Sequence, residues 1–521
     1  MSRPSMHTAR LAAPLFAVLA ACATSSEQAP TTPPKPAAQA PAAPAPKPTA
    51  PGGTPDADFR AQAPPAGPPV TFRPPVPKVL TLKSGLAVWL LERHELPLVS
   101  LELLVDAGSN TNPPGVPGVS SFVADMLDEG TATRDAPAIA AAFDDLAAIF
   151  HAASDQETFT ASLSVPTESL AAGVEVFADV VLHPAFRPGD VERVRRLRQG
   201  ELVQMLDDPE KVGRDVLGRV VYGERHPWAY SPKGTVDSNP KIGRAALAAW
   251  YRTWVRPNNA TLVVVGDVRE AELVSLLEKS FAGWAKGKVP KKTMPPPAPP
   301  PTRTLVLVDK ADAAQSQVWI GDLGLTSSSP ELYAARAANN VLGGGPKGRL
   351  FAVLRTQKAY SYGAYSELGE RLSEPGLFAA TGGIVADKTP EAVEEFFGVL
   401  DGLAKGGMSD GDLADAKSAV IRGLPSRFQT NAATATAFAT ARGLGFSPDY
   451  FAELPARVEA VTRTQADQAA RAHFTTAKAA VVVVGPMKSL QKRLEDLHVG
   501  PVQVRDPSGK LLSKPSAPSS R

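Results

Sequence analysis

The most regular hydrophobic pattern of the chain lies in residues 118–131, GVSSFVADMLDEGT. Its large apolar side chains recur at intervals of three and four residues, at Val119, Phe122, Val123, Met126 and Leu127. This spacing predicts an amphipathic helix with one buried face. A turn rich in proline and glycine precedes the segment, and Gly130 ends it. The small and acidic residues in between fall on a second face of the same helix.

Further apolar patterns predict a first folded half over residues 78–289. Leucine-rich and β-branched runs predict three strands within 79–109 and two more at 157–165 and 259–268. Helical spacing predicts helices at 137–149, 170–182, 188–206, a segment reaching 223, and 244–254. The last of these strands, NATLVVVGDV, is a continuous apolar run and is therefore expected to be buried.

The same pattern recurs in residues 303–500, after a proline-rich linker at 290–302. The segment AAVVVVGPM matches the earlier NATLVVVGDV, with Gly485 in the place of Gly266. Asp190 and Asp412 follow similar helical segments, and the interval between them is nearly the same as that between the two glycines. Two elements that repeat at one period predict a duplicated domain. We therefore expect an α+β fold made of two duplicated halves.

Composition adds two constraints. Lys and Arg number 55 against 53 for Asp and Glu, and the net charge of +2 gives no reason to expect nucleic acid as a partner. The 51 prolines concentrate in blocks. Residues 22–77 are rich in Ala and Pro, which predicts a disordered tether. The linker at 290–302 and residues 501–521 have similar compositions, and we expect the latter to form a disordered tail.

The single cysteine, Cys22, follows a short apolar run in residues 11–21 that two arginines precede. The run is too short to span a membrane, which takes about 20 residues. A plain secretory signal is an alternative, but it would not need the chain's only cysteine at its cleavage site. Residues 1–21 are thus expected to be a lipoprotein signal peptide and Cys22 the lipidated residue. Because Ala23 follows, we expect a lipid anchor in the cell envelope, at the outer membrane and facing the periplasm.

Four segments together resemble the pitrilysin/insulinase peptidases, whose zinc helix carries an inverted H-x-x-E-H motif. They are LPLVSLELLVDAGS, GVSSFVADMLDEGT, an Asp-Pro at 208–209 followed by GERHPW, and LFAVLRTQKAYSYG. The resemblance covers residues 79 to 490. It implies two halves, each a sheet with helices packed on one face, that form a clamshell around a peptide substrate.

The residues at the motif positions are Ser121, Ala124 and Asp125. Zinc hydrolysis needs three protein ligands, an open position for water and a carboxylate base. Ser121 is a poor ligand, Ala124 cannot accept a proton, and Asp125 favours other metals. The resemblance assigns the third ligand position to Glu201, in the helix that precedes the Asp-Pro. A carboxylate there either faces a cleft or partner, or extends from the helix edge into water. We expect no catalytic residue and no cofactor in this chain.

In the family, an Arg and a Tyr seven residues later reach the substrate, and Arg355 and Tyr362 match them. A chain with this pair but without the motif resembles the family's non-catalytic subunits. The resemblance implies that it binds peptide and forms a heterodimer with a homologue that carries the zinc. Two alternatives stay open: a stand-alone peptide-binding or scaffold lipoprotein without hydrolysis, and an active metallopeptidase with unusual ligands.

Overall fold

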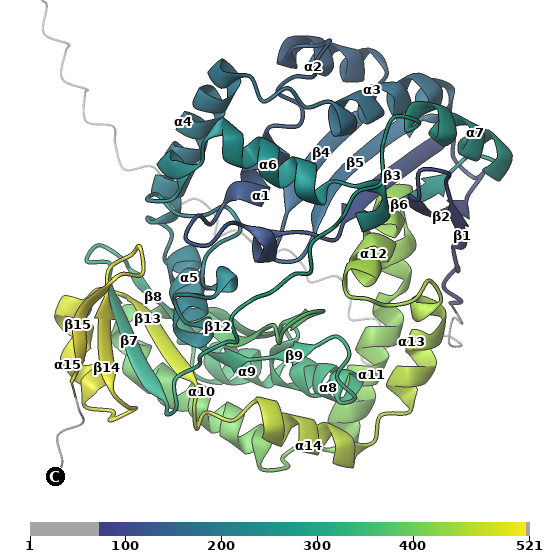
Figure 1. Cartoon of the computed structure of the whole chain (residues 1–521). Helices are drawn as coiled ribbons and strands as arrows, with labels where there is room; N and C mark the ends of the chain where they lie inside the picture. Colours follow the sequence, from purple (N-terminus) through teal and green to yellow (C-terminus); the bar gives the residue numbers. More distant parts are fainter. Residues whose placement is uncertain (1–71, 517–521) are drawn as a thin grey trace, which may run out of the picture. The chain divides into compact units, whose positions relative to one another are not determined.

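The computed structural model describes residues 72–516. Cys22, the signal segment and most of the predicted tether lie outside these residues. Within them, two large mixed sheets are each covered by helices, as the predicted α+β duplication requires (Figure 1).

The first sheet has six strands in the order β1-β2-β6-β3-β5-β4. Their bounds are Lys78–Thr81 (β1), Ala87–Glu92 (β2), Leu98–Val105 (β3), Ile149–Ser154 (β4), Phe159–Pro166 (β5) and Ala260–Gly266 (β6). Helices of the same half cover one face and share a core with it. They are α1 (Val119–Asp125), α2 (Ala136–Asp145), α3 (Leu170–Leu182), α4 (Pro188–Met205), α6 (Arg244–Trp254) and α7 (Glu270–Ser280).

The second sheet has seven strands in the order β10-β12-β8-β13-β7-β14-β15. Their bounds are Thr304–Asp309 (β7), Gln315–Leu323 (β8), Ser361–Leu368 (β10), Leu377–Val385 (β12), Ala480–Gly485 (β13), Val502–Arg505 (β14) and Leu511–Ser516 (β15). Two short strands, Leu325–Thr326 (β9) and Glu370–Arg371 (β11), pair beside it. The helices that share its core are α8 (Leu332–Gly343), α9 (Arg349–Phe351), α10 (Thr389–Ala404), α11 (Asp410–Gly423), α14 (Arg463–His473) and α15 (Met487–Glu495).

The second face of each sheet is covered by a helix from the other half (Figure 1). Helix α5 (Pro209–Tyr222) packs on β8 and β13 of the second sheet, and α12 (Asn431–Gly443) packs on β3 and β6 of the first. Helix α13 (Tyr450–Glu459) joins the same core as α12. This arrangement explains the continuous apolar runs, because β6 and β13 are buried on both faces.

The alternation of side chains along β6 shows the two faces directly. Leu262 and Val264 point into the core of their own half, whereas Val263 and Val265 share a core with Phe438 of α12. In β13 the roles are the same. Val481 and Val483 belong to the core of the second half, whereas Val482 and Val484 share a core with α5.

Three boundaries differ from the sequence-based expectation. The disordered tail expected at 501–521 is wrong for residues 502–516, because β14 pairs in parallel with β7 and β15 pairs with β14. The tether does not reach residue 77, since the Phe72 ring lies 5.5 Å from that of Phe428. Helix α1 ends at Asp125, although Met126 and Leu127 remain buried beyond it. The first two errors share one cause: contacts distant in sequence order a segment whose composition alone indicates disorder.

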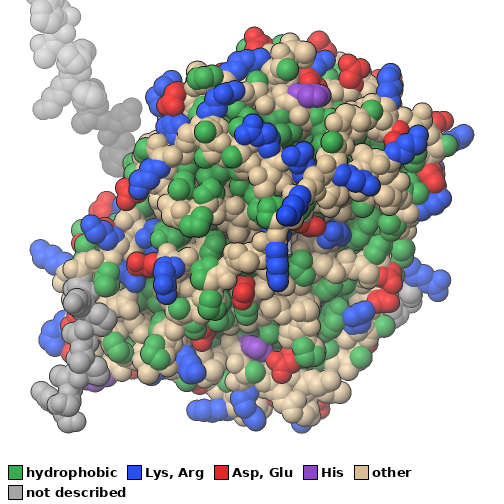
Figure 2. Space-filling model, viewed as in Figure 1, with side chains coloured by type: hydrophobic (Ala, Val, Ile, Leu, Met, Phe, Trp, Pro, Cys, Tyr) green, Lys and Arg blue, Asp and Glu red, His purple; other side chains and the backbone are tan. Residues whose placement is uncertain are grey.

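Charges of both signs are interspersed over the face seen in Figure 2, in keeping with the nearly balanced composition. In the described part of the chain, the helices are too short or too polar to cross a membrane.

Candidate functional site: a degenerate zinc-site helix

Helix α1 places the three motif positions as the spacing predicts. Val119, Phe122 and Val123 point into the core of the first half. Ala124 is also buried, and its methyl group offers neither a ligand nor a base. Ser121 and Asp125 lie on the opposite face and are partly exposed, so their oxygens are available to a neighbouring group.

That neighbour is Arg198 of α4, which is 1% exposed. One end of its guanidinium, Nη1, donates to Ser121 Oγ at 3.2 Å and to the Asp125 carboxylate. The other end, Nη2, donates to the carbonyl oxygen of Lys233 at 2.7 Å. A buried cation therefore joins the two residues that stand at the first and second ligand positions.

The electrostatics of this contact follow from burial. Loss of water lowers the pKa of the Arg198 guanidinium, and the neighbouring Asp125 carboxylate opposes that shift. The guanidinium also lies over the face of Phe122, with Cζ 4.8 Å from the ring centroid, which is a cation–π geometry. The Asp125 charge, the hydrogen bonds and the Phe122 ring thus all stabilise the Arg198 cation.

Glycine makes the contact with the Lys233 loop possible. Gly118, which precedes α1, has a φ of 102°, and a Cβ atom built on it would lie 2.6 Å from the Lys233 carbonyl oxygen. A larger residue would displace the loop that accepts the Arg198 hydrogen bond.

The residue at the third ligand position, Glu201, contacts a different side chain. Glu201, one turn after Arg198 on α4, is exposed and forms an ion pair with the ammonium group of Lys233. In the chain by itself, Glu201 lies at the exposed edge of the helix. The Glu201 carboxylate is thereby paired with Lys233 and has no hydrogen bond with Ser121 or Asp125.

These residues do not fit a zinc ion. Two of the three ligand positions are joined by a guanidinium, the third is paired with an ammonium, and the base is missing. Within residues 72–516, no three side chains of the types His, Cys, Asp and Glu gather as a metal site would require. We therefore derive no chemical step through a metal in this chain.

Arg355 and Tyr362 lie together in the second half. Arg355 is in a π-helical segment, Ala352–Gln357, and donates to the carbonyl oxygen of Tyr362, the second residue of edge strand β10. Its Cζ lies 4.4 Å from the centroid of the Tyr362 ring. The tyrosine is 83% exposed. The two residues are thus neighbours, and these contacts lie within their own half.

Sequence reasoning missed Arg198 and Lys233. The available signal was indirect: replacing two neutral histidines by a serine and an aspartate leaves a net negative charge facing α4. The helix carries four arginines, at 193, 195, 196 and 198, and the spacing alone does not say which one points inward.

Two family models match the chain. One, described as Insulinase (Peptidase family M16), covers residues 88–226, and the other, Peptidase M16 inactive domain, covers residues 241–420. The chain belongs to the insulinase family of peptidases, M16. Helix α1 lies within the residues that the insulinase model matches, so the frame recognised around it is a family feature of this M16 chain.

Among curated relatives, the M16 chain is 25% identical over 341 residues to the uncharacterized zinc protease YmxG of Bacillus subtilis, a match that covers 65% of this chain and 81% of the relative. It is 26% identical over 352 residues to the uncharacterized zinc protease Rv2782c of Mycobacterium tuberculosis, covering 67% and 79%.

Among solved structures, an M16 peptidase inactive domain from Pseudomonas fluorescens superposes with a TM-score of 0.73 at 24% identity, over 79% of this chain and 98% of that one. A protease from Helicobacter pylori gives a TM-score of 0.72 at 17% identity, over 78% and 100%. These two likenesses concern the fold.

Proposed function

We propose that this M16 chain is a non-catalytic subunit, which binds peptide and completes the chamber of a zinc-bearing partner. The observation that carries the proposal is the Arg198 guanidinium, bound to both Ser121 and Asp125. A divalent cation at that point would have to displace a buried cation, and like charges at contact distance repel strongly where water is excluded. Zinc is expected in the partner instead.

Exposed apolar side chains near the degenerate site support a partner surface. Leu197 and Val203, on either side of Glu201 in α4, are 57% and 49% exposed. Ile149, at the start of edge strand β4, is 72% exposed. A contiguous exposed apolar patch marks an interaction site, and we propose that the partner covers these side chains.

Arg355 and Tyr362 are proposed to act on the peptide. A guanidinium offers fixed donors for a peptide carbonyl, and an exposed phenol can donate to a developing oxyanion. The 83% exposure of Tyr362 leaves its hydroxyl available to a substrate or to the partner's chamber.

The location is proposed from the sequence. Cys22 would carry the lipid that holds the protein at the outer membrane, facing the periplasm. We expect Cys22→Ala to release the protein from the membrane fraction, because the acyl chains supply the anchoring free energy. Retention of the variant on membranes after a high-salt wash would contradict the lipid anchor.

The catalytic proposal is tested by co-expression with a zinc-bearing homologue from the same organism. We expect the purified single chain to hold no stoichiometric zinc and to leave an unstructured peptide intact, whereas the complex cleaves it. In the complex, Arg355→Ala and Tyr362→Phe should each lower turnover, by about 10²–10³-fold for loss of one oxyanion-type donor. Arg355→Lys should restore turnover only in part, since an ammonium lacks the planar fork.

Lys358→Ala is the matched control, because Lys358 is a nearby cation that pairs with Glu395 of its own half. If complexes with Arg355→Ala and with Tyr362→Phe both turn over at the wild-type rate, the pair has a structural role. That result would favour the stand-alone scaffold. Chelator-sensitive cleavage by the single chain, abolished by Glu201→Ala, would favour an active peptidase with unusual ligands.

A further inference from the structure

A cavity of about 910 Å³ lies beyond the Lys233 loop, next to the degenerate site. Its walls come from the end of α4, one face of α5, residues of the segments 109–117, 224–230 and 234–238, and the turn between β14 and β15. The site residues Ser121, Asp125 and Glu201 do not line it. It is therefore a separate feature of the fold.

The wall of the cavity combines polar and charged groups with large apolar side chains. Side chains of this kind that line it are Leu202, Met205, Leu206, Val212, Val236 and Leu511. A concave surface of this size, apolar with a few polar groups, is typical of ligand sites.

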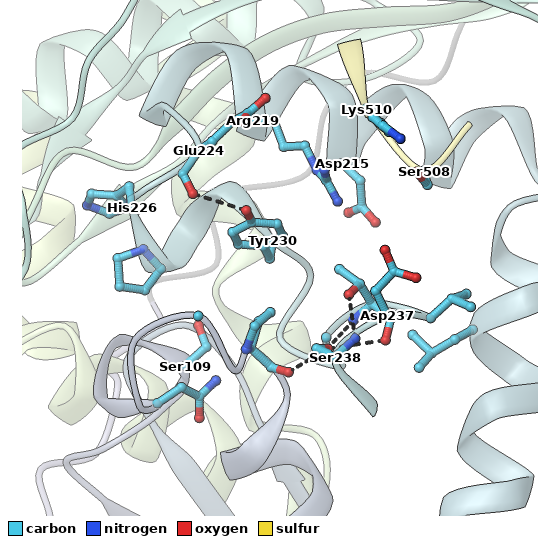
Figure 3. A pocket seen from close by; sticks show the side chains of 18 of the residues that line it. Ser109, Asp215, Arg219, Glu224, His226, Tyr230, Asp237, Ser238, Ser508 and Lys510 are labelled. Atoms are coloured by element: carbon cyan, nitrogen blue, oxygen red, sulfur yellow. Dashed lines mark hydrogen bonds between the residues drawn. The ribbon is translucent and has the colours of Figure 1, made fainter. Parts of the chain in front are cut away.

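A carboxylate stands against this apolar wall. Figure 3 shows the Asp215 side chain directed from α5 into the cavity, with Asp237 facing it from the loop and Arg219 and Lys510 nearby. Charge interactions with Arg219 and Arg214 act on Asp215 through space, and no hydrogen bond to it contributes. Its negative charge thus has no direct partner among the described residues.

The two arginines of α5, Arg214 and Arg219, each contact another side chain. Arg214 pairs with Glu367 of the second half, at 2.5 Å. Arg219 lies over the Tyr230 ring, with Cζ 4.7 Å from its centroid. The hairpin turn holds it there, because a Cβ on Gly509 would lie 2.7 Å from Arg219 Cδ, and that glycine has a φ of 82°. Arg214 is thus ion-paired, whereas Arg219 has an aromatic contact and no ion pair, and its Nε has no hydrogen-bond partner among the described residues.

The basic residues at the margin behave differently from Asp215. Arg225, Lys241 and Lys510 are exposed, and their long flexible side chains can carry the charged groups into water. The Asp215 carboxylate is short and fixed on a helix, so it cannot leave the cavity. Of the two charges fixed on α5 inside the cavity, Arg219 contacts a ring, and the Asp215 carboxylate has no hydrogen bond or ion pair among the described residues.

We propose that this cavity binds a ligand that presents one ammonium or guanidinium group to Asp215 from an apolar body. The same chemistry is available from a free amine and from a lysine or arginine side chain of a polypeptide. The proposal does not depend on the chain having a catalytic partner.

Burial also raises the pKa of the Asp215 carboxyl to about 6. An ionised carboxylate at this place disfavours the folded state, and such perturbed groups cluster at functional sites. A bound cation would remove that penalty. Asp215 would still be ionised at neutral pH, where a cation could bind.

The test is calorimetric titration of the purified full chain at neutral pH. The probes are hexylamine, the uncharged 1-hexanol, and an acetylated leucine-lysine-leucine tripeptide amide beside its glutamine analogue. We expect hexylamine to bind more tightly than hexanol, and the lysine peptide more tightly than the glutamine peptide, by about tenfold or more. Tighter binding of the lysine peptide than of hexylamine would identify a polypeptide as the source, and the reverse order a free amine.

Asp215→Asn should abolish these preferences. The matched control is Glu210→Gln, an exposed carboxylate on the same helix outside the cavity, which should bind as wild type does. Leu206→Trp, which fills the apolar wall, should block every probe. The proposal is overturned if neither cationic probe binds the wild type at millimolar concentration, or if Asp215→Asn retains the preference for the charged member of each pair.

Discussion

The contact between Arg198 and Asp125 predicts an asymmetric response to mutation. Asp125→Ala leaves a guanidinium with 1% exposure without its counter-charge. Breaking a buried pair in this way costs about 3–5 kcal/mol, and we expect the lower end, ~3 kcal/mol, since the Asp125 side chain is 35% exposed. The acceptors Ser121 Oγ and Lys233 O still satisfy two N–H groups, so the loss is mainly that of charge compensation.

Two further variants should lower the free energy of unfolding by smaller amounts. Asp125→Asn keeps an acceptor in the same position and should cost less, about 1–2 kcal/mol. Arg198→Met replaces the cation with an apolar side chain of similar length. Because Asp125 can then reach water, this change should cost less than Asp125→Ala.

The assay is urea unfolding followed by tryptophan fluorescence and circular dichroism, with equal m-values as the check that the same transition is compared. Glu201→Gln is the matched control, since it breaks the adjacent but exposed pair with Lys233 and should cost about 0–1 kcal/mol. If Asp125→Ala and Glu201→Gln unfold at the same urea concentration, the guanidinium is not held by its charge and the reasoning fails.

Two other predictions concern metal and pH. Restoring the motif by Ser121→His, Ala124→Glu and Asp125→His should not yield stoichiometric zinc while Arg198 remains, whereas adding Arg198→Leu should, as measured by elemental analysis; zinc in the triple variant would show that the arginine moves aside freely. For Asp215, burial raises the pKa from 3.8 to about 6, so wild type should lose stability relative to Asp215→Asn as pH rises from about 4 to 6, by at most ~3 kcal/mol. A constant difference between the two proteins across that pH range would contradict the assignment.

Much of the fold could be predicted because apolar periodicity reports which faces are buried. The repeat between the runs at 259–268 and 479–487 predicted two equivalent central strands, β6 and β13, and the structure confirms them. Periodicity does not report which segment covers a face. The placement of α5 on the second sheet and α12 on the first is therefore visible only in three dimensions.

The site shows the same limit at the level of single residues. The positions of Ser121, Ala124 and Asp125 could be located because the helix frame around them is intact. The role of Arg198 could not be predicted, since α4 carries several cations. Packing against α1 and the Lys233 loop determines which of them points inward. Asp215 was missed because an acidic residue inside a helix has the same local pattern whether it faces water or a cavity.

The reciprocal placement of α5 and α12 has a consequence during synthesis. The second face of the first sheet, which includes Trp89, Leu104 and Val263, stays uncovered until α12 has been made. The last strand of that sheet ends at Gly266, whereas α12 begins only at Asn431, after most of the second half. A first sheet that forms before this intervening chain is available would therefore carry a bare apolar surface. We therefore expect the two halves to depend on each other for complete cores, and the first half alone to be prone to aggregation.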